Sequence, residues 1–185
     1  MKTYRKRDFP VSMIRRYLEP GPIVLVASAW KGAQNIMTMG WHMVMEFEPS
    51  RIGCFITAAN HSYEMIRRSR ACVINVPTAD MAKTVAGIGS CTGAEVDKFA
   101  RFGLTAEAAD QVGAPLIAQC PVSLECRVTD TRLLRRYSLF ILEVVQAHAA
   151  PRPKYPKTLH YTGDGVFMVA GPRIDLRRQF RPDML

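Results

Sequence analysis

Short apolar runs, separated by glycine, proline and polar turns, are the dominant pattern along this chain. Residues 23–27 form the first continuous apolar run, Lys31 and Gly32 break it, and residues 35–41 return with methionines between polar groups. A short apolar run is typical of a buried strand, and a glycine lets the chain reverse. We therefore predict a hairpin over residues 22–41 whose turn and returning segment present a ligand.

The later segments predict further short strands. They are expected at residues 44–48, 52–57, 71–76, 121–129, 137–145 and 166–169. In the segment 121–129 the period is two, which places Val122, Leu124, Cys126 and Val128 on one face and polar side chains on the other. Its antiparallel partner, residues 137–145, is expected across a turn at residues 133–136.

Helices are predicted between these strands. An apolar stripe opposite several arginines predicts a helix over residues 63–70, a second helix is expected over residues 78–85, and a third over residues 96–102. Gly87, Gly89 and Gly93 are expected to turn the chain after the second helix into a loop. Thr105 is expected to begin another helical turn.

The order of these elements indicates the fold class. Short strands dominate and helices are inserted without regular alternation, which favours a closed or partly closed antiparallel barrel over a doubly wound parallel sheet. No GxGxxG or GxxxxGK[ST] motif is present, which disfavours a Rossmann or P-loop nucleotide site. We predict a mainly β fold with inserted helices in a single domain, residues 1–185, with its core at about residues 20–170 and a basic extension at each end.

The composition indicates how many domains the chain forms and where in the cell the protein is expected. A chain of 185 residues with 48% hydrophobic and 22% charged residues is sufficient for one domain with a sizeable core. Its apolar runs are far shorter than the roughly 18–20 residues of a membrane-spanning helix, and its charged start lacks the apolar centre of a signal peptide. A cytoplasmic protein without a membrane segment is expected.

The net charge of +9 raises the question of nucleic acid binding. Much of this charge lies in the two ends and at Arg135 and Arg136, positions that are more often solvated faces than binding grooves. Basic residues are not interleaved with aromatic ones, as a single-strand binding groove would require. Nucleic acid is therefore an unlikely partner, whereas a phosphorylated cofactor would benefit from the positive surface.

The remaining reactive side chains form no recognisable catalytic set. The five cysteines include no CxxC pair, so we expect free thiols, with Cys91 the most exposed because it lies in a glycine-rich turn. The four histidines have no HExxH spacing, and no metal site is expected. No GxSxG motif is present. No catalytic residue can be assigned.

The best candidate for a binding site is the segment 35–41. Asn35, Thr38 and Trp41 supply an amide, a hydroxyl and an indole N–H, and the neighbouring methionines can pack against a flat aromatic ligand. The alternative is structural: Gln34 and Asn35 complete a turn, while Met37, Met39 and Trp41 form the inner face of a strand.

Several stretches together resemble a known family. In chain order they are NIMTMGW at 35–41, NHSYEMI at 60–66, CVINVP at 72–77, DKF at 97–99 with GLT at 103–105, LEC at 124–126 and FILEV at 140–144. This series resembles the flavin reductase-like, FMN-binding split-barrel family, which includes flavoredoxins. The resemblance implies a Greek-key-like split β-barrel that binds FMN.

The resemblance also implies roles for particular residues. It places Asn35, Ile36, Met37, Thr38 and Trp41 along the cofactor, Ser62 and Lys98 at its phosphate, and Tyr137 and Phe167 near its ring. The alternatives are an N-cap for Ser62, a solvated helix residue for Lys98 and a core aromatic for Phe167. The chain departs from the family in two places: residues 92–94 lack a basic residue, and residues 136–138 lack a histidine.

The activity implied by the resemblance is an NAD(P)H-dependent FMN oxidoreductase. Such a protein takes a hydride onto N5 of bound FMN and passes electrons to free flavin, oxygen or a redox protein partner, and it is a homodimer because the family builds its flavin site at a subunit interface. Two alternatives stay open: a flavin-binding electron carrier without its own NAD(P)H activity, and, less favoured, a basic β-barrel that binds nucleic acid.

Overall fold

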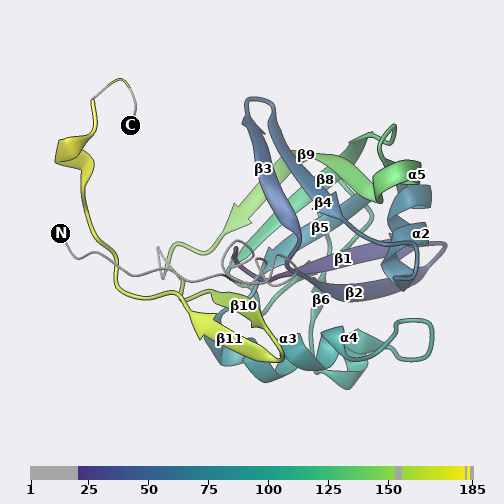
Figure 1. The fold of residues 1–185 in the computed structure, drawn as a ribbon. Coiled ribbons are helices and arrows are strands. Elements are labelled where there is room, and N and C mark those ends of the chain that lie inside the picture. The colour runs from purple at the N-terminus through teal and green to yellow at the C-terminus, as the bar shows by residue number, and fades with distance from the viewer. Residues whose placement is uncertain (1–20, 153–155, 182, 184–185) are drawn as a thin grey trace, which may run out of the picture.

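The fold is a large antiparallel sheet with a few short helices, as predicted. The computed structural model describes residues 21–152, 156–181 and 183. Within these residues, seven strands form one sheet in the order β2-β1-β5-β8-β9-β4-β3 (Figure 1). Their bounds are β1 Val24–Trp30, β2 Ala33–Met39, β3 His42–Phe47, β4 Ser50–Phe55, β5 Ala71–Val76, β8 Val122–Asp130 and β9 Leu139–Ala149.

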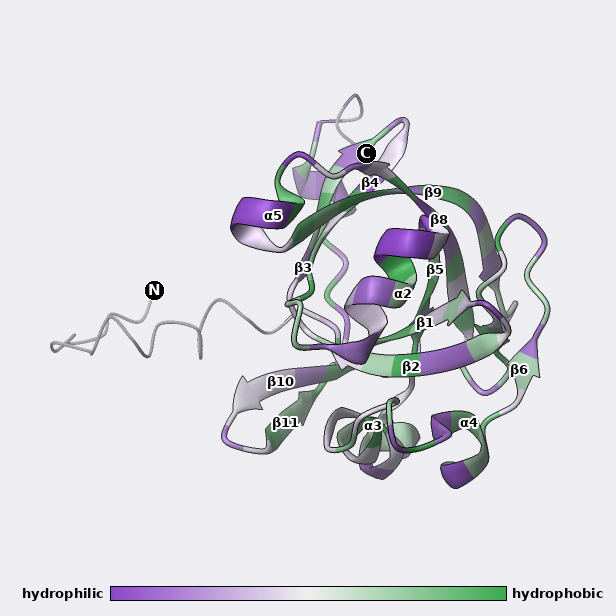
Figure 2. Cartoon of the chain, turned by 90° about the vertical axis from the view of Figure 1, so that its right-hand side faces the viewer, coloured by the Kyte–Doolittle hydropathy of each residue, from purple (hydrophilic) through white to green (hydrophobic). Residues whose placement is uncertain are grey.

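Smaller elements surround this sheet. Two two-stranded sheets pair β6 Ala106–Glu107 with β7 Leu116–Ile117 and β10 Leu159–Gly163 with β11 Val166–Val169. The α-helices are α2 His61–Ser69, α3 Ala82–Gly89, α4 Lys98–Arg101 and α5 Leu134–Tyr137, with short 3-10 turns η2 Ala79–Met81 and η3 Arg177–Gln179. Figure 2 shows the large sheet curled into an open barrel, with α2 across one end and β10–β11, α3 and α4 below β2.

The predicted first hairpin is confirmed. β1 pairs with β2 in a register that runs from Val24–Met39 to Trp30–Ala33. Lys31 and Gly32 form the turn with φ values of 50° and 82°, a left-handed conformation that glycine adopts without strain. The hairpin therefore fixes which side chains of β2 face α2 and which face α3.

The core lies on both sides of this hairpin. One cluster fills the barrel interior and includes Val26, Ile74 and Phe140. A second cluster packs the other face of β1 and β2, through residues such as Leu25 and Ile36, against α3 and α4. Burial of large apolar side chains is the main stabilising contribution of such a core. The two clusters hold β2 between α2 and α3, where the candidate site lies.

The predicted end of the second helix at residue 85 was too early. α3 continues through Gly87 and ends at Gly89, because both glycines serve close packing, whereas Gly93 lies in the loop that follows, as predicted. A Cβ on Gly87 would lie 2.5 Å from the Phe102 ring, and one on Gly89 would lie 3.4 Å from Thr38 Cβ. Gly89 thus allows α3 to pack closely on β2, and Gly87 allows the same helix to pack closely on Phe102.

Three other elements differ from the prediction. The segment after Thr105 is strand β6 rather than a helical turn, since Ala106 pairs with Ile117 and Ala118 N donates to Thr105 O at 3.0 Å. The expected turn at 133–136 is helix α5, which contains Tyr137, so that β9 begins only at Leu139. Strand β10 was not predicted at all.

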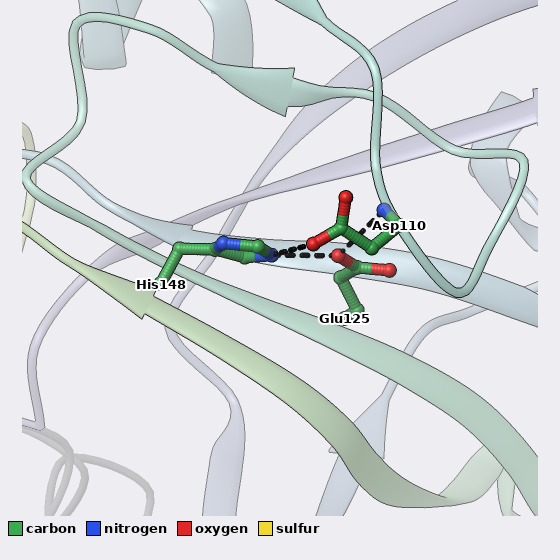
Figure 3. Close-up of side chains that lie close together, drawn as sticks. All are labelled: Asp110, Glu125 and His148. Atoms are coloured by element: carbon green, nitrogen blue, oxygen red, sulfur yellow. Dashed lines mark hydrogen bonds and ion pairs between the residues drawn. The ribbon is translucent and has the colours of Figure 1, made fainter.

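The polar face predicted for residues 121–129 is not fully exposed. Ser123 and Glu125 are both buried there: Ser123 Oγ donates to Asn75 Oδ1 at 2.6 Å, and the segment between β6 and β7 covers Glu125. Both carboxylate oxygens of Glu125 accept hydrogen bonds, from the backbone N–H groups of Asp110, Gln111 and Val112 and from His148 Nε2 at 2.6 Å (Figure 3). Glu125 therefore fastens this segment to the sheet.

The predicted basic N-terminal extension lies outside the described residues. The described C-terminal residues 171–181 are exposed and run away from the barrel (Figure 1). Within the described part of the chain, no helix has the length and apolar character required to cross a membrane.

Candidate functional site

Two adjoining cavities lie between β2, α3, the start of α2 and the β10–β11 hairpin. One has a volume of about 470 Å³ and is lined by mostly apolar side chains, and the other has a volume of about 320 Å³ and is lined by mostly polar ones. Met37, Asn60, Gly89 and Ser90 belong to both linings. The cavities therefore share a wall and can hold two parts of one ligand.

Aromatic pairs flank the apolar cavity. Trp41 packs on Phe55 with ring centroids 5.1 Å apart, and Tyr161 packs on Phe167 at 5.0 Å. These four rings come from β4, from β10–β11 and from the residues that join β2 to β3. Such a cavity suits a flat, apolar ring system.

Thr38 connects the floor of this cavity to α3. Its hydroxyl donates to Val85 O at 2.7 Å, so the hydroxyl hydrogen is already used and the oxygen is left as an acceptor. A hydroxyl held in this way positions β2 against α3. We therefore assign Thr38 to the cavity lining but not to a donor role from its side chain.

The polar cavity contains buried hydrogen-bonding groups. Asn35 is 2% exposed and Ser62 is fully buried, and Asn35 Nδ2 donates to Ser62 Oγ at 2.8 Å. Asn35 Oδ1 has no hydrogen-bond partner among the described residues. Because a buried polar atom without a partner is costly, this oxygen is a position where a ligand donor would be stabilising.

Lys98 places a buried cation at the same cavity. Its side chain is on α4, is 5% exposed and donates from Nζ to Ile88 O at 2.9 Å. Burial lowers the pKa of Lys98 because the ammonium loses hydration, and in the described part of the chain no carboxylate pairs with it. An anion in the polar cavity would compensate this charge.

The glycine of residues 92–94 also shapes the polar cavity. A Cβ built on Gly93 would lie 2.0 Å from Asn35 Oδ1, so the backbone of this loop approaches the amide more closely than any other residue type would permit. The loop thus brings backbone groups to a cavity whose described lining contains one lysine, Lys98, and no arginine.

Most of the predicted site residues are brought together. Met37, Thr38, Trp41 and Phe167 line the apolar cavity, and Asn35, Met37, Ser62 and Lys98 line the polar one. The N-cap alternative for Ser62 is wrong, because Asn60 is the N-cap of α2 and Ser62 lies in its first turn. The solvated alternative for Lys98 is also wrong, since the residue is buried.

Two predicted residues do not reach either cavity with their side chains. Ile36 is fully buried in the core beside α3, because neighbouring strand residues point to opposite faces and its neighbours Asn35 and Met37 face the polar cavity. Tyr137 is on α5, is half-exposed and has the Arg136 guanidinium 5.3 Å from its ring centre. The structure therefore leaves their predicted cofactor contacts without support from side-chain position.

Sequence reasoning missed several lining residues, notably Tyr161, Phe55 and Asn60. Tyr161 lies in β10, and the signal for that strand was present: an alternating segment from Leu159 is followed by the turn residues Gly163, Asp164 and Gly165. The packing of Phe55 against Trp41 had no such signal, because it depends on how β4 approaches the start of β3.

Sequence reasoning also missed a separate cluster formed by β8, β9 and the segment between β6 and β7. Asp110, Glu125 and His148 bring ligand-type atoms within 4.8 Å of one another, although the sequence suggested no acidic group near a histidine (Figure 3). The two Glu125 oxygens already accept hydrogen bonds from N–H groups. We therefore interpret this cluster as the fastening of a loop.

Comparison with known proteins places this geometry in context. The family described as "Flavin reductase like domain" matches residues 15–169. The uncharacterized protein YddH of Escherichia coli is 30% identical over 173 residues, covering 86% of this chain and 92% of that protein.

Solved structures show the same fold. An FMN-binding domain of a flavin reductases-like enzyme from Shewanella baltica is 26% identical, with a TM-score of 0.76 over 90% of this chain and 95% of that one. Flavoredoxin from Methanosarcina acetivorans is 21% identical, with a TM-score of 0.82 over 98% of this chain and 100% of that one. The predicted split-barrel fold is thereby confirmed.

Proposed function

This chain belongs to the flavin reductase like family, and on that premise we propose that it binds FMN in the two adjoining cavities and acts as an NAD(P)H-dependent flavin oxidoreductase. The similar Shewanella baltica domain is described as FMN-binding, which supports the choice of flavin. The observation that carries the proposal is the buried Lys98 ammonium, without a carboxylate partner in the described residues, at the polar end of an aromatic cavity.

The residues present fit the two ends of FMN. The phosphate carries about two negative charges and three acceptor oxygens, which match Lys98 Nζ and the backbone N–H groups at the start of α2. The ribityl chain carries hydroxyl donors, and Asn35 Oδ1 is a buried acceptor without a partner in the described part of the chain. The flat ring system matches the aromatic walls of the apolar cavity.

The chain's own residues would bind, orient and shield the cofactor. Trp41, Phe55 and Phe167 exclude water from the ring, and Thr38 fixes β2 against α3 so that the cavity keeps its shape. FMN, when bound, supplies the ability to accept two electrons from a nicotinamide. A protein that supplies binding and orientation needs no nucleophile or metal of its own for this chemistry.

We also propose a homodimer whose second copy covers the apolar side chains beside the cavity. β3 is an edge strand of the large sheet, and the β3–β4 hairpin projects beyond it (Figure 1). Its apolar side chains include Val44 and Phe47, which are 71% and 87% exposed, and the half-exposed Met43 and Met45. Exposed apolar side chains on an edge strand next to the half-exposed Trp41 are typical of an interface.

Anaerobic stopped-flow mixing tests the reaction. The FMN-loaded protein is mixed separately with NADH and NADPH, and bleaching of the flavin absorbance is compared with that of free FMN. The proposal predicts that at least one nicotinamide reduces the bound flavin faster than free FMN. Equal or slower bleaching by both nicotinamides would overturn the reductase activity and leave the electron-carrier alternative.

A further inference from the structure

Cys91 lies at the polar cavity beside the buried ammonium. It follows the end of α3, lines the cavity together with Asn35, Ser62 and Lys98, and directs Sγ to Gly87 O at 3.4 Å. Lys98 Nζ donates to Ile88 O, a carbonyl that Cys91 Sγ also approaches at 3.9 Å. A negative charge on Cys91 would interact favourably with Lys98.

The other four cysteines are poorly placed to react. Cys54, Cys72, Cys120 and Cys126 are all buried, whereas Cys91 is partly exposed. Burial raises the pKa of Cys120 to about 12 and raises the pKa of Cys54 further, so their thiolate forms are rare at neutral pH. A hydrogen bond with Cys126, together with burial, raises the pKa of Cys72. Cys91 is thus the accessible thiol of the chain.

Independent evidence indicates that the space beside Cys91 is built for a ligand. Asn35 is 98% buried, lines this cavity and leaves Oδ1 without a partner among the described residues. The carboxamide also lies against Gly93, where no side chain could be accommodated. A reagent with a negative charge would find a buried cation at the cavity that Cys91 also lines.

We propose that Cys91 is a modification site for anionic low-molecular-weight disulfides, and that a mixed disulfide at Cys91 and a phosphate group in the polar cavity exclude one another. The first half rests on the cavity alone, and the second half, applied to FMN, rests on the proposed function. The consequence is a redox control of cofactor loading, in which an oxidised thiol pool blocks the cavity and a reduced one reopens it.

The reaction is an ordinary thiol–disulfide exchange. Cys91 releases its proton to solvent, and its sulfur attacks one sulfur of the disulfide. The reagent's S–S bond breaks, a new S–S bond joins Cys91 to one half of the reagent, and the other half leaves as a thiolate. The disulfide is the oxidant, and a second thiol reverses the step.

The first experiment measures the selectivity of Cys91. The full chain, without added flavin, is treated with the anionic reagent 5,5′-dithiobis(2-nitrobenzoate) and with neutral 4,4′-dithiodipyridine, and both rates are divided by those for N-acetylcysteine. We expect one fast thiol, absent in Cys91→Ser, and a preference for the anionic reagent of about tenfold from the neighbouring cation. Lys98→Met should abolish this preference, and high salt should lower it in the unchanged protein.

The second experiment measures the exclusion. Inorganic phosphate and FMN should each slow labelling of Cys91, and riboflavin, which lacks the phosphate, should slow it less. Labelled protein should bind FMN at least about tenfold more weakly than the same sample after reduction with dithiothreitol. Cys91→Ser, treated in the same way, should show no difference between its treated and reduced samples.

The results test the modification site, the mutual exclusion and the proposed function separately. No preference for the anionic reagent, or no effect of phosphate on labelling, would overturn the modification site. If FMN binds but neither protects Cys91 nor is displaced by labelling, exclusion is wrong while the proposed function stands. If FMN does not bind at all while phosphate still protects Cys91, the proposed function and the control of FMN loading both fail, and the anion-directed thiol remains.

Discussion

At the residue scale, the proposed phosphate site depends most on Lys98 and Ser62. We expect Lys98→Ala and Ser62→Ala each to weaken FMN binding by about 1–3 kcal/mol, since a charge-assisted hydrogen bond or its buried support is lost. Riboflavin binding should weaken less, because riboflavin has no phosphate. Quenching of flavin fluorescence in titrations with both flavins gives the affinities of the unchanged protein and of both variants. Equal losses for the two flavins would contradict a phosphate contact.

The two tryptophans provide a matched comparison at the same scale. Trp41 lines the apolar cavity and is 52% exposed, whereas Trp30 lies at the tip of the first hairpin. Trp41→Ala should change the spectrum of bound flavin and slow its reduction, and should destabilise folding by less than the about 3–5 kcal/mol typical of a buried aromatic. Trp30→Ala should leave the flavin spectrum as it is. An unfolded Trp41→Ala protein would instead assign Trp41 to the core.

Individual residues also show how far sequence reasoning reached. The motifs located Asn35, Ser62 and Lys98, because short segments carry chemistry that recurs at fixed positions. They could not show that Lys98 is buried, since its burial depends on how α4 packs near α3. The same applies to Ile36, which was assigned to the site through its neighbours although strand alternation turns its side chain into the core.

At the scale of elements, Glu125 fastens the segment between β6 and β7 to the sheet. Burial alone would raise the pKa of Glu125, but hydrogen bonds from His148 and from the backbone N–H groups of Asp110 and Gln111 outweigh it and hold this pKa below its usual value. A carboxyl whose pKa is lowered on folding stabilises the protein above its unfolded pKa. This stabilisation is lost as the pH falls through the folded pKa.

We therefore expect Glu125→Gln to reduce the free energy of unfolding by about 1–3 kcal/mol at neutral pH, since an amide NH₂ would face backbone donors. Urea unfolding of both proteins at several pH values measures the difference. It should shrink as the pH falls from neutral to below the usual range of a glutamate. A difference that stays constant down to acid pH would contradict the role of the ionised carboxylate. Glu107→Gln, at an exposed carboxylate of neighbouring β6, is the matched control.

Helices and strands were predicted well where the local sequence pattern determines them, and less well where packing against distant residues determines them. The first hairpin, helix α2 and strand β5 follow from apolar runs and turn residues. The glycines of α3 were misinterpreted because the close approach of Phe102 and Thr38 has no local signal. Helix α5 occupies a connection that sequence spacing alone predicted as a turn.

At the scale of the whole molecule, the exposed β3 row predicts self-association. We expect the protein to be a dimer by light scattering after gel filtration, and Phe47→Asp to shift it toward the monomer, because a charge would enter an apolar interface. Ile174→Asp is the matched control, since Ile174 is 82% exposed but lies on the C-terminal segment. A monomer at all concentrations, or equal effects of both variants, would contradict the proposed interface.

The overall fold could be predicted because many weak motifs agreed in order, and the family match over residues 15–169 confirms it. The convergence of β2, α3, α2 and β10–β11 on one pair of cavities could not be predicted from local patterns, since these elements are far apart in the chain. The described C-terminal residues 171–181 line neither cavity, and the predicted N-terminal extension lies outside the described residues.

The most direct test of the central claim is the visible spectrum of the purified full chain during titration with FMN. We expect the flavin absorbance to stay with the protein through gel filtration. FMN fluorescence should be quenched to saturation during the titration, and riboflavin should bind more weakly. A colourless protein that fails to retain FMN at any concentration tested would contradict the assignment of the two cavities to a flavin.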